Sequence, residues 1–349
     1  DAVTDPHSEA PVTRHNSLES VDIDGGNVSV KLALGYPAES ARAELAETIE
    51  KAVSAIEGVN AVKVELDTDI QSHAVQEGTK PLEGVKNIIA VASGKGGVGK
   101  STVSANLALA LSAEGANVGI LDADIYGPSQ PRMFGLSGQP TTDGTHLQPM
   151  ASYHIQTMSI GYLIEEDTPM IWRGPMVTQA LEQLLRDTKW EDLDYLIIDL
   201  PPGTGDTQLT LAQKVPVSGA VIVTTPQDIA LIDARKAVKM FEKVEIPILG
   251  VIENMSTHVC SNCGHEEHIF GEGGGQRMAD DYDVDFLGDI PLNGKIRANM
   301  DGGKPTVVAD PDGDIADRYR AIARKAAAKL ASRKKDYSAA FPNIVIQQN

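Results

Sequence analysis

Residues 94–101 constrain the fold more than any other part of the chain. Their sequence, Gly-Lys-Gly-Gly-Val-Gly-Lys-Ser, fits the phosphate-loop pattern G-x-x-x-x-G-K-[ST] in full. The loop follows an apolar run, Ile88 to Ala92, and opens a helix that we expect from about Lys100 to Ala113. Glycines let backbone N–H groups turn toward phosphate oxygens, and a helix N-terminus favours negative charge. The sequence therefore predicts a site for Mg-ATP between a strand and a helix.

Each residue of this loop has an expected role. Lys100 is expected to contact the β- and γ-phosphates, Ser101 to bind Mg²⁺, and Thr102 to reach the α-phosphate. The predicted nucleotide-binding residues of this segment are Gly94, Lys95, Gly96, Gly97, Val98, Gly99, Lys100, Ser101 and Thr102.

From residue 86 onward, short apolar runs alternate with helical stretches. Such runs with helical crossovers are typical of a parallel sheet that is covered on both faces, in which the loops at the carboxyl ends of the strands carry function. We therefore predict an α/β P-loop domain. The expected strands are 88–91, 118–121, 195–198, 220–223 and 248–252.

The first part of the chain has a different pattern. Two alternating runs, Asn27–Leu34 and Ala61–Leu66, flank a stretch with helical spacing from Ala41 to Ile56. We expect a small α+β domain over residues 1–75, a linker over 76–85, the P-loop domain over 86–335 and a tail over 336–349. Because the first residue is Asp1, we expect the natural start to lie upstream.

Three acidic residues follow predicted strands. Asp122 and Asp124 come after one strand, and Asp199 ends another in the run Ile-Ile-Asp-Leu-Pro-Pro-Gly, which resembles a Walker B strand with a switch loop. Asp199 is expected to hold Mg²⁺ through water, because carboxylates at this edge suit the metal. Gly203 is expected to present its N–H to the γ-phosphate. For Asp122 and Asp124, the alternative to a role at the nucleotide is capping of the next turn, because Asp is a favoured cap.

Lys95 is not needed to hold the nucleotide of its own chain. With this residue the sequence resembles the deviant P-loop ATPases, which include MinD, ParA and the nitrogenase iron protein. The resemblance implies a homodimer in which Lys95 is catalytic toward the partner's nucleotide, as an arginine finger would be. It also implies that Asp124 orients the attacking water with help from Asp122, and that Asn254 contacts the base. By residue type, Asn254 is equally suited to forming a turn.

The chain has two cysteines, Cys260 and Cys263, in a Cys-x-x-Cys pair. Three interpretations compete. A redox pair normally precedes a helix, which the following Gly-His-Glu-Glu does not resemble. A zinc site needs four ligands, which His258, His265 and His268 could complete. An iron–sulfur cluster usually takes four thiolates, and two symmetric chains supply four.

Longer motifs narrow the choice. The segments 122–135, 172–176 (Trp-Arg-Gly-Pro-Met), 199–206, 225–228 and 253–256 together resemble the Mrp/ApbC iron–sulfur cluster carriers over residues 84 to 333. The resemblance implies that Cys260 and Cys263 hold a [4Fe–4S] cluster at a homodimer interface and that ATP hydrolysis serves its transfer to apo-proteins. A cluster-assembly scaffold is the implied second partner. More weakly, residues 1–75 resemble a MIP-type domain, with His7 replacing the usual acid after Asp5-Pro6.

The composition excludes some functions. The net charge of −19 and the pI of about 4.8 argue against nucleic-acid binding. No run of eighteen uncharged apolar residues is present, so we expect no membrane helix, and the two cysteines fit a cytoplasmic setting. The alternative function is that of a MinD/ParA-like positioning ATPase whose cysteine pair binds zinc.

Overall fold

The computed structural model describes residues 2–14, 17–76, 79–164, 174–260, 262–333 and 335. Trp172 and Arg173 of the predicted motif, Ser261 between the two cysteines, and the predicted tail over 336–349 lie outside the described residues.

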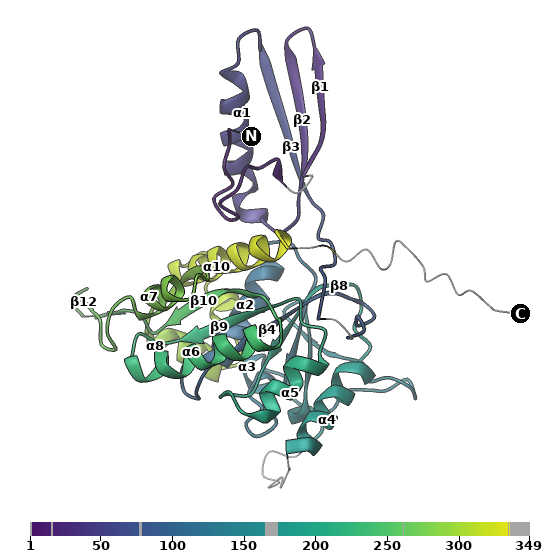
Figure 1. The fold of residues 1–349 in the computed structure, drawn as a ribbon, viewed down its shortest axis with the longest axis vertical. Helices are drawn as coiled ribbons and strands as arrows, with labels where there is room; N and C mark the ends of the chain where they lie inside the picture. Colours follow the sequence, from purple (N-terminus) through teal and green to yellow (C-terminus); the bar gives the residue numbers. More distant parts are fainter. Residues whose placement is uncertain are drawn as a thin grey trace, which may run out of the picture.

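An eight-stranded sheet forms the centre of the molecule (Figure 1). Its strand order is β13-β10-β9-β4-β8-β5-β7-β6, and every neighbouring pair is parallel except β6 and β7. The α/β fold with a parallel sheet that the sequence predicts is therefore confirmed. The strands are β4 Val85–Ala92, β5 Val118–Asp122, β6 Met150–Ser152, β7 Ile155–Ser159, β8 Leu193–Asp199, β9 Gly219–Thr224, β10 Ile248–Asn254 and β13 Phe286–Ile290.

Helices cover both faces of this sheet. Alternate residues of β4 face opposite ways, so Ile89 and Val91 join a core with α2 and α10, while Ile88 and Ala90 join a second core with α4, α5 and α6. The helices are α2 Lys100–Ala113, α3 Gln130–Met133, α4 Gly174–Asp187, α5 Asp206–Lys214, α6 Asp228–Lys243, α7 Gly274–Asp281, α8 Gly294–Asp301, α9 Thr306–Ala309 and α10 Asp314–Ala331, with a 3-10 turn at Ile160–Tyr162.

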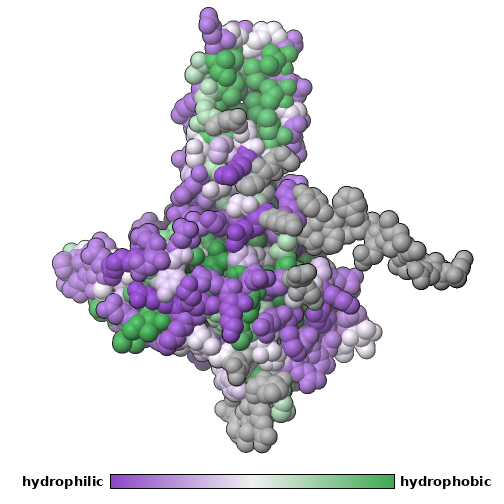
Figure 2. Space-filling model, in the orientation of Figure 1, coloured by the Kyte–Doolittle hydropathy of each residue, from purple (hydrophilic) through white to green (hydrophobic). Residues whose placement is uncertain are grey.

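The N-terminal unit is a three-stranded sheet with one long helix, and it stands beside the end of α10 (Figure 1). Strand β2 (Asn27–Leu34) pairs antiparallel with β1 (Leu18–Asp24) and parallel with β3 (Ala61–Thr68). Helix α1 (Arg42–Ser54), which follows a 3-10 turn at Glu39–Ala41, packs on β3. Figure 2 shows a hydrophobic area on this unit, at the top of the view.

A buried carboxylate joins the two units. Glu114 caps the C-terminal end of α2, and its side chain is fully buried. It accepts hydrogen bonds from the backbone N–H of Ser40 at 2.9 Å, from the Ser40 hydroxyl at 2.5 Å and from Arg324 of α10 at 2.5 Å. The N-terminal unit is therefore fixed to the far end of the helix that begins at the phosphate loop.

All of the predicted strands are present, but in the three-stranded and eight-stranded sheets the sequence pattern missed four strands. Strand β1 was missed because most of it is exposed and it reads as polar, and β6 and β7 because they are three and five residues long. Strand β13 was missed because polar Asp285 and Asp289 interrupt its apolar pattern.

Candidate functional site

The phosphate loop lies where β4 ends and α2 begins. Gly99, with φ of +81°, immediately precedes α2, and a Cβ on it would lie 2.2 Å from the amide nitrogen of Asn254. Gly94 touches α6 so closely that a Cβ would meet the carbonyl carbon of Asp233 at 2.0 Å. Glycine is therefore required at both positions, and the loop is held between α6 and the end of β10.

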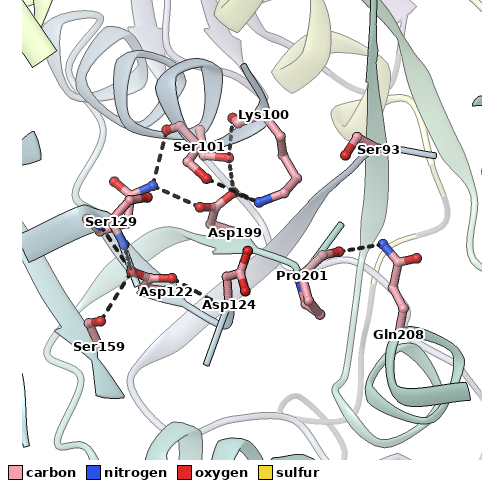
Figure 3. Close-up of polar contacts among 12 residues, drawn as sticks. Ser93, Lys100, Ser101, Asp122, Asp124, Ser129, Ser159, Asp199, Pro201 and Gln208 are labelled. Carbon is pink, nitrogen blue, oxygen red and sulfur yellow. Dashed lines mark hydrogen bonds and ion pairs between the residues drawn. The ribbon is translucent and has the colours of Figure 1, made fainter. Parts of the chain in front are cut away.

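Lys100 and Asp199 form a buried ion pair at the centre of the site (Figure 3). The Lys100 ammonium lies 2.6 Å from Asp199 Oδ1 and 3.2 Å from the Ser101 hydroxyl. The exposed fractions of the two paired side chains are 6% and 0%. The sequence predicts that Lys100 contacts phosphate and that Ser101 and Asp199 serve Mg²⁺, and the fold brings these three side chains together.

The donor set fits the expected metal. A hydroxyl and a carboxylate are oxygen ligands of the kind that Mg²⁺ prefers. Ser101 supplies the first and Asp199 the second, and both lie within hydrogen-bond distance of the same ammonium. Residues that could hold Mg²⁺ are thus present in one place, and their magnesium role stays a prediction.

Asp122 and Asp124 differ in their surroundings although they are two residues apart. Asp122 is fully buried, and it accepts hydrogen bonds from the backbone of Asp124, Ser129 and Gln130 at 2.9–3.2 Å and from the Ser159 hydroxyl at 3.2 Å. Asp124 is only half-buried. The arrangement favours Asp124 as the residue that meets water and Asp122 as the residue that shapes the loop.

The burial of Asp122 has an electrostatic consequence. Burial, together with the neighbouring negative charge of Asp199, raises the pKa of Asp122 to about 7. Burial also raises the pKa of Asp124, against the opposing effect of the Lys100 ammonium. Asp122 is therefore the acid of this pair whose protonation changes near neutral pH.

Two residues of this cluster were not predicted from the sequence. Gln130 donates from its side-chain amide to Asp199 Oδ2 at 2.9 Å, and Ser104 donates to Asp199 Oδ1 at 2.8 Å. Ser104 lies one helical turn after Lys100, which places it on the same side of α2, and that spacing was the available signal. Gln130 follows the Gly-Pro-Ser segment directly, but nothing in its residue type indicated that it would reach Asp199.

In the part of the chain that the structure describes, Lys95 has no partner for its charge. Its side chain is half-buried, and among the described residues no hydrogen bond or ion pair involves its ammonium group. Its backbone carbonyl accepts a 2.9 Å hydrogen bond from the Ser93 hydroxyl. The structure thus distinguishes the two lysines of the loop, since Lys100 is fully engaged within the chain and Lys95 is not.

The loop after β8 is tied to the loop after β4. The N–H of Gly203 donates to the carbonyl of Ser93 at 3.1 Å, and Gln208 of α5 donates to the carbonyl of Pro201 at 3.1 Å. The sequence predicts that Gly203 presents its N–H to a γ-phosphate. For that, the N–H must first leave the carbonyl of Ser93. The bond is therefore a natural point for nucleotide-dependent rearrangement.

Asn254 contacts the phosphate loop directly. Its side-chain amide donates to the carbonyl of Val98 at 2.9 Å, and the residue is buried at the end of β10. The contact of Asn254 with the nucleotide base stays a prediction, because in this structure its side-chain NH₂ group donates to the phosphate loop. What the structure adds is a link between the loop and the segment that follows β10.

That following segment carries the cysteines. Strands β11 (His258–Val259) and β12 (Glu266–Glu267) form a small hairpin, and Cys260 and Cys263 lie in its turn. Cys260 is partly exposed and Cys263 is exposed. The backbone N–H groups of Asn262 and Cys263, followed by the second thiol, lower the pKa of Cys260, which favours the thiolate that binds metals.

The histidines near this hairpin do not gather around the cysteines. His258 contacts the carbonyl of Leu292 at 3.2 Å, while His265 and His268 face Glu267 and Glu272 at 3.9 Å. Among the described residues, no group of three or more His, Cys, Asp or Glu side chains is arranged to hold a metal ion. The histidine ligands that the zinc hypothesis requires are thus not assembled within this part of one chain.

Apolar side chains are exposed in the segments that follow the carboxyl ends of the sheet strands. They come after β5, β7, β9 and β10, which end at the same edge as the phosphate loop. Among the described residues of these segments, the exposed apolar side chains are Tyr126, Leu163, Met176, Ile229, Ile232, Val259 and Ile269. The edge that contains the nucleotide site therefore carries exposed apolar side chains.

The sheet order, the phosphate loop and the carboxylates at the strand ends define a P-loop NTPase with a MinD/ParA-like fold. The structure is similar to that of the nucleotide-binding protein of Archaeoglobus fulgidus solved in complex with ADP, with a TM-score of 0.58 and 38% identity over 67% of this chain and 92% of that one. The cell division ATPase MinD of Pyrococcus furiosus shares the fold, with a TM-score of 0.53 and 22% identity over 68% of this chain and 97% of that one.

The chain belongs to the NUBPL iron-transfer P-loop NTPase family, whose model matches residues 84–327. A second model, described as an iron-sulfur cluster assembly protein, matches residues 1–66. The iron-sulfur cluster carrier protein of Escherichia coli K12 is 51% identical over 92% of this chain and 89% of its own length. The mouse iron-sulfur cluster transfer protein NUBPL is 50% identical over 76% of this chain and 84% of its own length. The family predicted from the motifs is thereby confirmed.

In the described residues, no helix is both long and apolar enough to cross a membrane.

Proposed function

We propose that this protein is an ATP-dependent carrier that binds a [4Fe–4S] cluster between two copies of the chain and transfers it to apo-proteins. The relatives named as iron-sulfur cluster carrier and transfer proteins support the cargo. The observation that carries the proposal is the contact of Asn254 with Val98, because it joins the phosphate loop to the segment in which Cys260 follows six residues later.

The nucleotide half of the proposal starts from the ion pair of Lys100 with Asp199. A phosphate group in the loop competes for the Lys100 ammonium, since both phosphate and carboxylate are anions. As Lys100 turns to the phosphates, Asp199 is released to hold Mg²⁺ together with Ser101. The metal, when bound, neutralises charge on the phosphate oxygens. Asp124, which is half-buried, then orients the attacking water.

The homodimer is proposed on the state of Lys95. A half-buried lysine whose charge has no partner among the described residues fits a role across an interface, where the partner's nucleotide supplies the negative charge. The exposed apolar side chains at the same edge, among them Tyr126 and Ile229, are surface that a second copy would cover. Both features point to the face that contains the phosphate loop.

Coupling of ATP to the cluster follows from the connections of the loop. Filling the loop shifts the Val98 carbonyl and hence Asn254, at the base of the cysteine segment. Release of Gly203 from Ser93 changes the neighbouring loop at the same time. Two chains then bring four thiolates together, which is the usual ligand set of a [4Fe–4S] cluster, and their exposure leaves the cluster accessible to an acceptor protein.

We also propose the division of labour among the segments. Residues 86–335 form the ATPase, residues 76–85 link it to the N-terminal unit over residues 1–75, and this unit is a docking module for cluster-assembly scaffolds or acceptors. The Glu114 contacts with Ser40 support mechanical connection between the unit and α2.

Anaerobic reconstitution with iron and sulfide tests the function. We expect about four irons per dimer with the broad visible absorption of a [4Fe–4S] cluster, transferred to an apo-protein in a nucleotide-dependent manner. The Cys260→Ala, Cys263→Ala double variant, which lacks all cysteines, should take up none, whereas Lys95→Ala should take up the full amount. Full uptake by the double variant would refute the site, and uptake by monomers alone would refute the shared cluster.

A further inference from the structure

Gln130 contacts both of the residues that are predicted to hold Mg²⁺, Ser101 directly and Asp199 through water. It begins α3, directly after the Gly127-Pro128-Ser129 segment, and only 1% of it is exposed. Its side-chain nitrogen donates to the backbone carbonyl of Ser101 at 3.1 Å and to Asp199 Oδ2 at 2.9 Å. One amide group therefore connects Ser101, whose hydroxyl is expected to bind Mg²⁺, with the carboxylate of Asp199.

The orientation of this amide is fixed by its partners. Both neighbours of the nitrogen are oxygen acceptors, so only the NH₂ group can face them. The amide oxygen, Oε1, points elsewhere and is buried without a hydrogen-bond partner among the described residues. A buried acceptor left without a donor is costly, which indicates that a donor occupies this position in another state of the site.

The two oxygens of Asp199 are divided between different partners. Lys100 and Ser104 donate to Oδ1, whereas Gln130 donates to Oδ2. Departure of Lys100 to a phosphate leaves the Gln130 contact intact, so Oδ2 stays anchored while Oδ1 becomes available. The backbone N–H of Gln130 also donates to Asp122 at 3.0 Å, which links this anchor to the acidic loop.

We propose that Gln130 is a positioning residue for Mg²⁺. It sets the place of the Asp199 carboxylate relative to Ser101, and its free Oε1 accepts a hydrogen bond from a water molecule bound to the metal. The inference rests on the proposed Mg-ATP site and deepens it. Partners that orient metal ligands typically change metal affinity by about 10- to 100-fold when they are removed.

A purely structural role for Gln130 makes a different prediction. If the side chain only holds the phosphate loop in shape, its loss weakens nucleotide binding equally with and without metal. If it positions the metal ligands, its loss weakens binding only when the metal takes part. The two roles are therefore separated by measuring nucleotide affinity in both conditions.

The test uses the full chain with a fluorescent ADP analogue, titrated in EDTA and at increasing Mg²⁺. Gln130→Met keeps the volume of the side chain and removes its hydrogen bonds, while Gln130→Glu keeps the shape and replaces the NH₂ donor by an acceptor. We expect both variants to need at least about tenfold more Mg²⁺ for half-maximal enhancement of binding, with unchanged affinity in EDTA. With Mn²⁺ as a paramagnetic probe, the spectrum of the bound metal should change as well.

Gln156→Met is the matched control. Gln156 is also partly buried and uses its amide, but it contacts the backbone of Glu191 near the amino end of β7. This variant should bind Mg-ADP as the unmodified protein does. Equal losses with and without metal, or an unchanged Mg²⁺ requirement, would overturn the inference while leaving the nucleotide site in place. Absence of Mg²⁺-dependent binding by the unmodified protein would instead refute the proposed function itself.

Discussion

The phosphate site and the cysteine hairpin lie at the same edge of the molecule and are built in opposite ways. At the phosphate site, Asp122 and Asp199 are fully buried and each accepts several hydrogen bonds from neighbouring elements. At the hairpin, Cys260 and Cys263 are partly or fully exposed, in a turn whose backbone bonds are local. Hydrogen bonds from several elements thus hold the side chains of the phosphate site in place, whereas few contacts hold the thiols of the hairpin.

This difference matches two different tasks. A site that must orient ATP benefits from groups that are already in position, because their ordering costs nothing at the moment of reaction. A site that must release its cargo benefits from exposed ligands that another protein can reach. Changes in the buried region should therefore alter stability, pH dependence and catalysis, and changes in the hairpin should alter cargo alone.

The largest effect is expected for Lys95→Ala. If Lys95 acts across the proposed dimer, loss of its charge should lower kcat for ATP hydrolysis by about 10³- to 10⁵-fold, as for arginine fingers, while nucleotide affinity and cluster content stay unchanged. Steady-state hydrolysis and nucleotide titration measure the two quantities. Mixed dimers that combine Lys95→Ala with an ATP-binding-deficient chain, such as Lys100→Met, should show which subunit needs the residue. Full activity of Lys95→Ala would show that the site is complete within one chain.

The next effect concerns stability in the absence of nucleotide. Lys100→Met leaves the carboxylate of Asp199 buried without its counter-ion, which should lower the free energy of unfolding by about 3–5 kcal/mol. Adding Asp199→Asn should restore much of this loss, since no buried charge then remains. Denaturant unfolding of both single variants and of the double variant gives the free energies of unfolding that a double-mutant cycle needs. Equal stability of Lys100→Met and the unmodified protein would show that Asp199 does not need the Lys100 charge to stay buried.

Much of the fold was predictable from the sequence because its signals are local. The five predicted strands of the central sheet, and helix α2 after the loop, have contiguous patterns of apolar residues and glycines. Strand β1 was not predictable in this way, because its sequence is polar and exposed. It is a strand because its backbone pairs with β2. The order of the strands is likewise set by long-range packing rather than by any one segment.

The candidate site shows the same division. Lys100, Ser101 and Asp199 were expected to lie together because motifs at strand ends specify them. The contacts of Gln130 with Asp199, and of Asn254 with Val98, depend on loops that converge from distant parts of the chain. No local pattern of residue types encodes such convergence, so these contacts required the structure.

A smaller effect is expected in the pH dependence of stability. Because the pKa of Asp122 is raised to about 7 in the folded protein, from an ordinary value of 3.8, the folded state binds more protons than the unfolded state between these values. The stability contributed by protonated Asp122 is thus present at low pH and lost as pH rises through about 7. Asp122→Asn should remove a slope of at most about 1.4 kcal/mol per pH unit. If the free energy of unfolding depended on pH in the same way for the variant and the unmodified protein, the raised pKa of Asp122 would be contradicted.

The smallest effect is expected at the hairpin, and it provides the sharpest contrast. In metal-free protein, Cys260→Ala with Cys263→Ala should change the free energy of unfolding by less than about 0.5 kcal/mol, because exposed side chains away from buried networks contribute little. The backbone bonds from Cys260 to His265 and from Gly264 to Cys260 survive the substitution. Thermal and denaturant unfolding in the presence of a chelator and a reductant measure the difference. A loss comparable with that of Lys100→Met would mean that the thiols maintain the hairpin even without cargo, and the contrast between a prearranged site and an exposed one would then fail.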